Sequence, residues 1–114
     1  MSFWRNEVVQ PALEAETRKH IDEQLAWIAR DPGNPRPHLN LAELYRMEGR
    51  GDEALGLMLH AVKLDPAFAA AHVALTELYV VRGDYPAAWR HARRAQLEGE
   101  PRAVAFLLRH SVPE

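Results

Sequence analysis

An internal repeat of 34 residues is the feature that most constrains the fold of this chain. When the sequence is aligned with itself at that offset, residues 35–68 match residues 69–102, and the identities fall at helical spacing. The identical pairs are His38 and His72, Leu41 and Leu75, Glu43 and Glu77, Leu44 and Leu78, Tyr45 and Tyr79, Gly49 and Gly83, Ala54 and Ala88, and Ala61 and Ala95. Short repeated units stack on their neighbours, so contacts between adjacent units should replace a single central core.

The first unit is predicted to be two helices joined by a turn. Pro37 suits a helix start, because proline lacks only an N–H that would have no partner in the first turn. Gly49 interrupts the apolar pattern, and Asp52 is expected to cap the second helix. Leu55, Met58, Leu59 and Val62 would form one apolar face, and Pro66 ends the pattern.

The second unit repeats this plan. We expect a helix over about residues 68–82, a break at Gly83, a cap at Asp84 and a second helix that ends at Gly99. The chain is rich in Ala, Leu, Arg and Glu, which favour helices, and poor in Val and Ile. These patterns together predict an all-α fold.

The residues at these spacings resemble the tetratricopeptide repeat (TPR) family. The residues that carry the resemblance are Leu41, Tyr45, Gly49, Ala54, Ala61 and Pro66 in the first unit, and Leu75, Tyr79, Gly83, Ala88 and Ala95 in the second. The second unit departs from the family pattern with Thr76 in place of a small residue and Glu100 in place of the closing proline. The resemblance implies antiparallel helix pairs stacked as a short right-handed α-solenoid.

The flanking segments extend the predicted array. Residues 12–30 align with the second helix of a unit, and residues 1–10 are interpreted as a remnant of a first helix. We therefore expect four segments: a degenerate repeat at 1–34, repeats at 35–68 and 69–100, and a capping helix with a tail at 101–114. The capping helix is apolar over a wide arc, so part of its surface is expected to lack a partner within the monomer.

Composition excludes several classes of function. The chain has no cysteine, which removes disulfides, thiol catalysis and cysteine-based metal sites. A net charge of −2 argues against binding nucleic acid through bulk positive charge, and no apolar stretch is long enough for a membrane span. We expect a cytoplasmic protein without nucleic-acid or membrane partners. The net charge conceals an acidic segment at 7–31 and a basic segment at 82–109. This uneven distribution of charge favours an anionic partner or head-to-tail association.

Catalytic and metal sites are not indicated. The chain contains none of the common nucleotide-binding, hydrolase or metalloprotease motifs, so we expect no enzyme activity. His38 and His72 are interpreted as packing residues with a solvated tip, whereas His20, His60 and His91 fall at different phases of the second helices. No metal or cofactor is therefore expected, and a histidine-based metal or haem carrier is kept as a second alternative.

The resemblance implies that partners lie along a concave groove lined by the first helices. The candidate groove residues are Arg36, Leu39, Asn40, Glu43, Arg46, Met47, Val73, Glu77, Val80 and Val81. Leu39, Met47, Val73, Val80 and Val81 are large apolar residues that the helix-pair core does not require, and exposed apolar strips often mark partner sites. Alternatively, the N-terminal segment or another subunit covers this strip.

Chaperone-binding members of the family grip a carboxylate with Lys, Asn and Arg side chains. The corresponding residues here are Arg5, Val9, Asn40, Ala70 and Ala74, of which only Asn40 matches fully. We therefore expect no such clamp and a groove suited to an apolar peptide or helix of another protein. The first alternative to this non-enzymatic binding module is a scaffold that associates with itself as a homo-oligomer.

Overall fold

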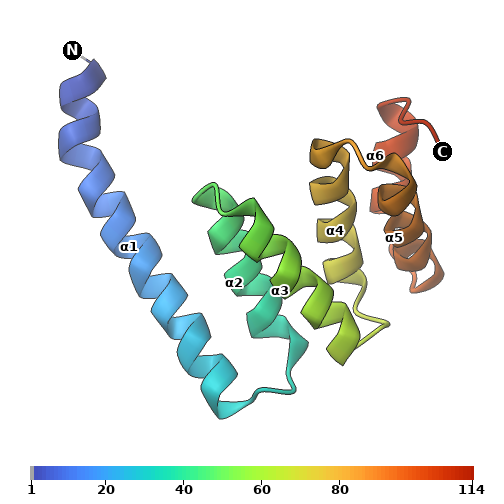
Figure 1. Ribbon diagram of the computed structural model, residues 1–114, viewed down its shortest axis with the longest axis horizontal. Helices are drawn as coiled ribbons and strands as arrows, with labels where there is room; N and C mark the ends of the chain where they lie inside the picture. Colours follow the sequence, from blue (N-terminus) through green and yellow to red (C-terminus); the bar gives the residue numbers. More distant parts are fainter. Residues whose placement is uncertain (1) are drawn as a thin grey trace.

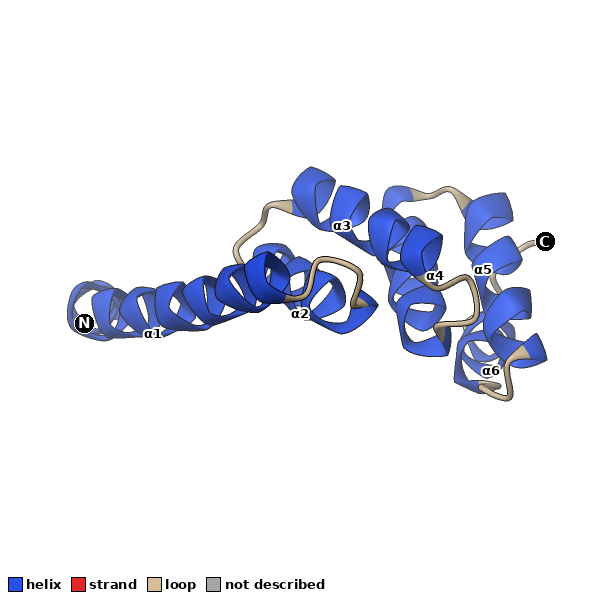
Figure 2. Cartoon of the chain, turned by 90° about the horizontal axis from the view of Figure 1, so that it is seen from below, coloured by secondary structure: helices blue, strands red, loops and turns tan. Residues whose placement is uncertain are grey.

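The computed structural model describes the backbone of residues 2–114 and the side chains of residues 13–114. The helices are α1 (Ser2–Arg30), α2 (Pro35–Met47), α3 (Gly51–Leu64), α4 (Ala69–Arg82), α5 (Tyr85–Leu97) and α6 (Arg102–Arg109). Figure 1 shows α1 to α4 following one another from left to right, with α5 and α6 together at the right, and Figure 2 shows that the described chain consists of helices and short loops, without strands. The predicted all-α stack of antiparallel helix pairs is confirmed.

The helix boundaries follow from local chemistry. Asn34 caps α2 because its side-chain oxygen accepts a hydrogen bond from the Arg36 N–H at 3.0 Å. Asp84 caps α5 in the same way, accepting from the Ala87 N–H at 3.2 Å as predicted. Gly49 and Gly83 follow α2 and α4 with φ of 78° and 77°, a left-handed conformation that costs glycine little.

The predicted cap at Asp52 is wrong. The first turn of α3 closes between the Ala54 N–H and the Arg50 carbonyl at 3.0 Å, so the helix begins at Gly51 and Asp52 lies inside its first turn. Asp52 instead forms an ion pair with Arg82 at the end of α4. Its carboxylate still lies at the favourable end of the helix dipole, but it satisfies no backbone N–H.

Buried alanines lie at the helix crossings of both repeats. Ala54, Ala61, Ala88 and Ala95 are completely buried, as the repeat pattern predicts. The larger core cluster joins α2, α3 and α4 around Met58, while a second cluster joins α5 to α6 around Trp89 and Leu107. The core is therefore distributed between neighbouring helices.

The N-terminal segment differs from the predicted remnant of a helix pair. Residues 2–30 form one continuous helix, so no turn separates residues 1–10 from residues 12–30. Ile21 is buried against α2, consistent with its alignment to Leu55 of the second helix in the first unit. The assignment of residues 1–34 as a degenerate repeat, and the division of the whole chain into four segments, remain predictions.

Among the described residues, no helix combines the length and the apolar character needed to cross a bilayer.

Candidate functional site

The first helices α2 and α4 and the closing helix α6 form a continuous surface, which we call the first-helix surface. An ion pair joins α2 to α4, and an open cavity lies between α4 and α6. Because both features bridge elements from different units, the surface depends on the stacking of the repeats.

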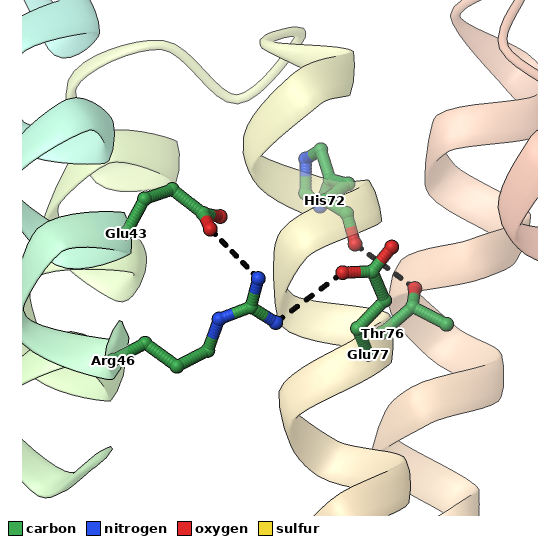
Figure 3. Close-up of polar contacts among 5 residues, drawn as sticks. All are labelled: Glu43, Arg46, His72, Thr76 and Glu77. Carbon is green, nitrogen blue, oxygen red and sulfur yellow. Dashed lines mark hydrogen bonds and ion pairs between the residues drawn. The ribbon is translucent and has the colours of Figure 1, made fainter. Parts of the chain in front are cut away.

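One arginine connects two carboxylates across the units (Figure 3). Arg46 donates to Glu43 at 2.8 Å within α2 and to Glu77 of α4 at 3.3 Å. Glu43 and Glu77 are equivalent residues of the repeat, whereas Arg46 has Val80 as its counterpart. All three charged side chains are partly exposed, so the pairs contribute little stability, but they place one excess negative charge on the surface.

Two large apolar side chains are strongly exposed on this surface. Met47 is 74% exposed at the end of α2, and Val81 is 82% exposed near the end of α4. They are separated by 34 residues, so each unit presents an aliphatic group at the same position. Side chains this exposed do not stabilise the fold, and exposed apolar groups that recur in this way often mark partner sites.

The cavity between α4 and α6 adds a concave, partly apolar element. Its volume is about 270 Å³, and Val73 of α4 and Phe106 of α6 supply apolar walls. Glu77 reaches it from one side, and Arg102 and Arg109 reach it from the other. The sequence prediction did not include α6 in the groove, although the apolar arc of residues 104–108 was a signal for it.

Several predicted groove residues are structural. Leu39 is only 6% exposed and belongs to the core, so its assignment to the groove is wrong. Val73 and Val80 pack partly against the cluster between α5 and α6, which contradicts the expectation that the core does not need them. The prediction considered one helix pair at a time, whereas α6 covers these side chains from the next position in the stack.

Asn40 and Arg36 contact other parts of the chain. The Asn40 amide donates to the Gln24 side-chain oxygen at 3.1 Å and so joins α2 to α1. The Arg36 guanidinium lies 4.8 Å from the centre of the Phe68 ring. Of the residues compared with the carboxylate clamp, Ala74 is buried, and the side chains of Arg5 and Val9 lie outside the described part.

The repeated histidines form contacts that sequence reasoning missed. His72 Nε2 lies 2.8 Å from the Pro66 carbonyl, and its Nδ1 lies 3.0 Å from His91 Nδ1. A carbonyl can only accept, so His72 donates from Nε2 and its Nδ1 accepts the proton of His91 Nδ1. In the first unit His38 Nε2 donates to the Pro32 carbonyl at 3.3 Å. In both units a proline lies six residues before the histidine, and this shared spacing was a sequence signal for the contact with the proline carbonyl.

These histidines are buried more deeply than predicted. His38 and His72 are each 6% exposed, so they pack as expected but have no solvated tip. His38 packs edge-on against the His60 ring at 4.7 Å, and its Nδ1 has no hydrogen-bond partner. Burial, followed by the neighbouring His72 and Arg90, lowers the pKa of His91 to about 4. Within residues 13–114, no three His, Asp or Glu side chains are grouped closely enough to hold a metal ion.

Comparison with known proteins identifies the same units. The profile of the tetratricopeptide repeat matches residues 35–59 and 69–94, which correspond to α2 with more than half of α3 and to α4 with most of α5. The TPR repeat-containing thioredoxin TTL4 of Arabidopsis thaliana is 39% identical over 64 residues. The matched segment covers 56% of this chain but only 9% of that relative, so the likeness concerns a small part of a much longer protein.

Proposed function

Because this chain belongs to the tetratricopeptide-repeat family, whose repeats mediate protein–protein interaction, we propose that it binds a peptide or helix of another protein on the first-helix surface. The observation that carries the proposal is the repeated exposure of Met47 and Val81. The role is non-enzymatic: the partner is held and released without covalent change.

Apolar burial supplies the main affinity in this proposal. A partner that covers Met47 and Val81 removes two aliphatic side chains from water, and each Å² of apolar area removed contributes about 25 cal/mol. A further apolar side chain of the partner fits the cavity between Val73 and Phe106. A cavity of about 270 Å³ accommodates a single large side chain rather than a folded segment.

Polar groups beside these apolar contacts set direction and register. The carboxylates of the Glu43–Arg46–Glu77 network lie one helical turn before the exposed aliphatic groups, and both retain acceptor capacity. Arg102 and Arg109 provide the opposite charge at the α6 end of the surface. The partner is therefore expected to place a hydrogen-bond donor near Glu77 and an acidic group near α6.

The fold is suited to this role because the surface is organised before binding. Completely buried alanines fix the spacing of the helices, and the Arg46–Glu77 pair adds a contact between α2 and α4. A partner thus loses its own conformational freedom on binding, but the surface loses little.

The test replaces the exposed aliphatic groups and compares them with a matched site elsewhere. The double variant Met47→Glu with Val81→Glu should lose the proteins that the wild-type chain captures from an extract of its own cells. Leu97→Glu is the control, because Leu97 is also 82% exposed but lies on the second helix α5. Quantitative mass spectrometry of the captured proteins gives the readout.

A photo-reactive amino acid at residue 47 or 81 should cross-link to the same proteins, whereas one at residue 97 should not. Equal capture by the double variant and by Leu97→Glu, with both variants folded by circular dichroism, would exclude the first-helix surface as the binding site.

A further inference from the structure

Helix α6 turns one face toward the cavity that it shares with α4. Arg102, Phe106 and Arg109 all line this cavity, and their spacing places them on the same side of the helix. Ala105 lies on that side too, and its short side chain leaves the space beside Phe106 open. This face of α6 therefore has an arginine at each end and an apolar middle.

The floor and the walls of the cavity are apolar. Thr76 and Ala103 are 0% and 2% exposed, so they form the floor. The Thr76 hydroxyl donates to the His72 carbonyl at 2.9 Å and has no proton to offer a ligand. Val73 and Phe106 are partly buried and form the walls. The interior therefore suits a hydrocarbon side chain.

An aromatic ring suits this interior better than an aliphatic chain. The ring of Phe106 favours a second ring packed edge-to-face or offset against it. The guanidinium groups of Arg102 and Arg109 at the rim favour the face of an aromatic ring. Phenylalanine combines these properties, because it has no polar atom that the buried floor would leave without a partner.

The rim attracts carboxylates on one side only. Arg102 donates to Glu100 through Nε at 2.8 Å, which leaves its two Nη groups for other acceptors. Arg109 forms no ion pair with a carboxylate of residues 13–114. Glu77 reaches the cavity from α4, where it binds Arg46. A carboxylate of a partner is therefore attracted to α6 and repelled from α4.

The two arginines also set the spacing of the acidic groups. Arg102 and Arg109 lie two helical turns apart, about 10 Å along the helix axis. In an extended segment, alternate side chains point to the same side, so an anchor residue shares its side with the residues two before and two after it. Those two flanking residues are about 13 Å apart, a separation that the long arginine side chains reach.

We propose that the cavity between α4 and α6 binds an extended segment of the partner protein with the order acidic–any–phenylalanine–any–acidic. The phenylalanine ring packs between Val73 and Phe106, and the two carboxylates pair with Arg102 and Arg109. The segment runs along α6 rather than across α4. This inference rests on the proposed function, because it specifies which part of the partner the first-helix surface recognises.

The probe is a blocked peptide with the order Glu-Ser-Phe-Ser-Glu. It is titrated into the isotope-labelled chain at about 20 mM salt, where charge pairs are weakly screened, and followed by NMR. Amide signals of residues 73–77 and 102–109 should shift. A peptide with Ala in place of Phe should bind at least tenfold more weakly. A peptide with Gln in place of both Glu should lose about tenfold.

Variants of the chain test the same contacts. Ala105→Leu fills the cavity from its rim without a change of charge and should weaken peptide binding at least tenfold. Ala26→Leu is the matched control, because Ala26 is an exposed alanine of α1. Arg109→Gln should weaken binding about threefold, whereas Arg90→Gln, at an exposed position of α5, should not change it.

No binding up to about 5 mM peptide would overturn the proposal. So would equal binding of the Phe and Ala peptides, equal binding of the Glu and Gln peptides, or full binding by Ala105→Leu. If the peptide fails to bind while Met47→Glu with Val81→Glu still abolishes partner capture, only this inference is wrong. If the peptide binds while that double variant captures its partners normally, the proposed role of Met47 and Val81 is wrong and this inference stands.

Discussion

The two repeats hold equivalent helices together with different chemistry. In the first unit Ala42 packs without polar contact, while its counterpart Thr76 donates to the His72 carbonyl at 2.9 Å and approaches the Ala88 carbonyl at 3.4 Å. In the first unit His38 meets His60 edge-on, while in the second His72 and His91 share a hydrogen bond.

The difference shows which features the repeat requires. Small side chains at the crossing points are common to both units and completely buried in both. The polar contacts around these small side chains differ between the units. Such contacts therefore adapt each unit to its neighbours and do not set the helix geometry. The predictions below test this division between shared and variable features.

The largest effect is expected at a shared position. Ala54→Leu and Ala88→Leu each insert a larger group where two helices cross without free space, which should lower the free energy of unfolding by about 2–3 kcal/mol. Urea denaturation followed by circular dichroism measures the change. Similar losses in both units are expected, and a cost below about 0.5 kcal/mol in either would contradict the interpretation of these alanines as close contacts.

An effect of intermediate size is expected in the pH dependence of the free energy of unfolding, and it should arise from His91 in the second unit. His91 has a folded pKa of about 4, below the usual value of 6.5, so the unfolded chain binds its proton first. The contribution of neutral His91 to the free energy of unfolding is complete above pH 6.5 and is lost as the pH falls toward 4. Because His91 is only partly buried, we expect a loss of about 1–2 kcal/mol in the free energy of unfolding across this window.

The matched variants for this prediction are His91→Gln and His60→Gln. His91→Gln should flatten the pH dependence between pH 6.5 and 4, whereas His60→Gln should keep it, since His60 is exposed. A titration of His91 by NMR near its ordinary value would remove the physical basis of the prediction.

The smallest effect concerns the helix starts. Asp84→Ala removes the only side chain that caps α5 and should cost about 1 kcal/mol. Asp52→Ala should change little, because Asp52 caps no N–H and its ion pair with Arg82 is exposed. The unfolding midpoints of Asp84→Ala and Asp52→Ala, each compared with the wild type, measure this difference in cost. Equal costs would mean that Asp52 also functions as a cap.

The sequence predicted the features that depend on local periodicity. The helix pairs, the buried alanines and the cap at Asp84 follow from spacing within one unit, and the structure contains all of them. The assignment of Leu39 to the groove failed, and Val73 and Val80 also pack partly against a core cluster, because the burial of a side chain depends on helices from neighbouring units. The spacing within a single helix pair carries no information about α6, which lies beside α4.

The histidine contacts were missed for a related reason. His72 pairs with His91, whereas the equivalent His38 meets His60, which occupies a position one helical turn further along its helix. No fixed spacing in the sequence describes both pairs. Met47 and Val81, which the sequence assigns to the groove, are 74% and 82% exposed, and their role in binding stays a prediction.

The bonds from His38 and His72 to the Pro32 and Pro66 carbonyls have a mechanical consequence. Each imidazole fastens the loop that precedes its unit and also packs against the second helix of that unit. The angle between successive units and the packing inside a unit are thus tied to the same ring. A force that changes the angle between two units must therefore also disturb the packing of the two helices within a repeat. Bending between units and unfolding within a unit are mechanically coupled through these two histidines.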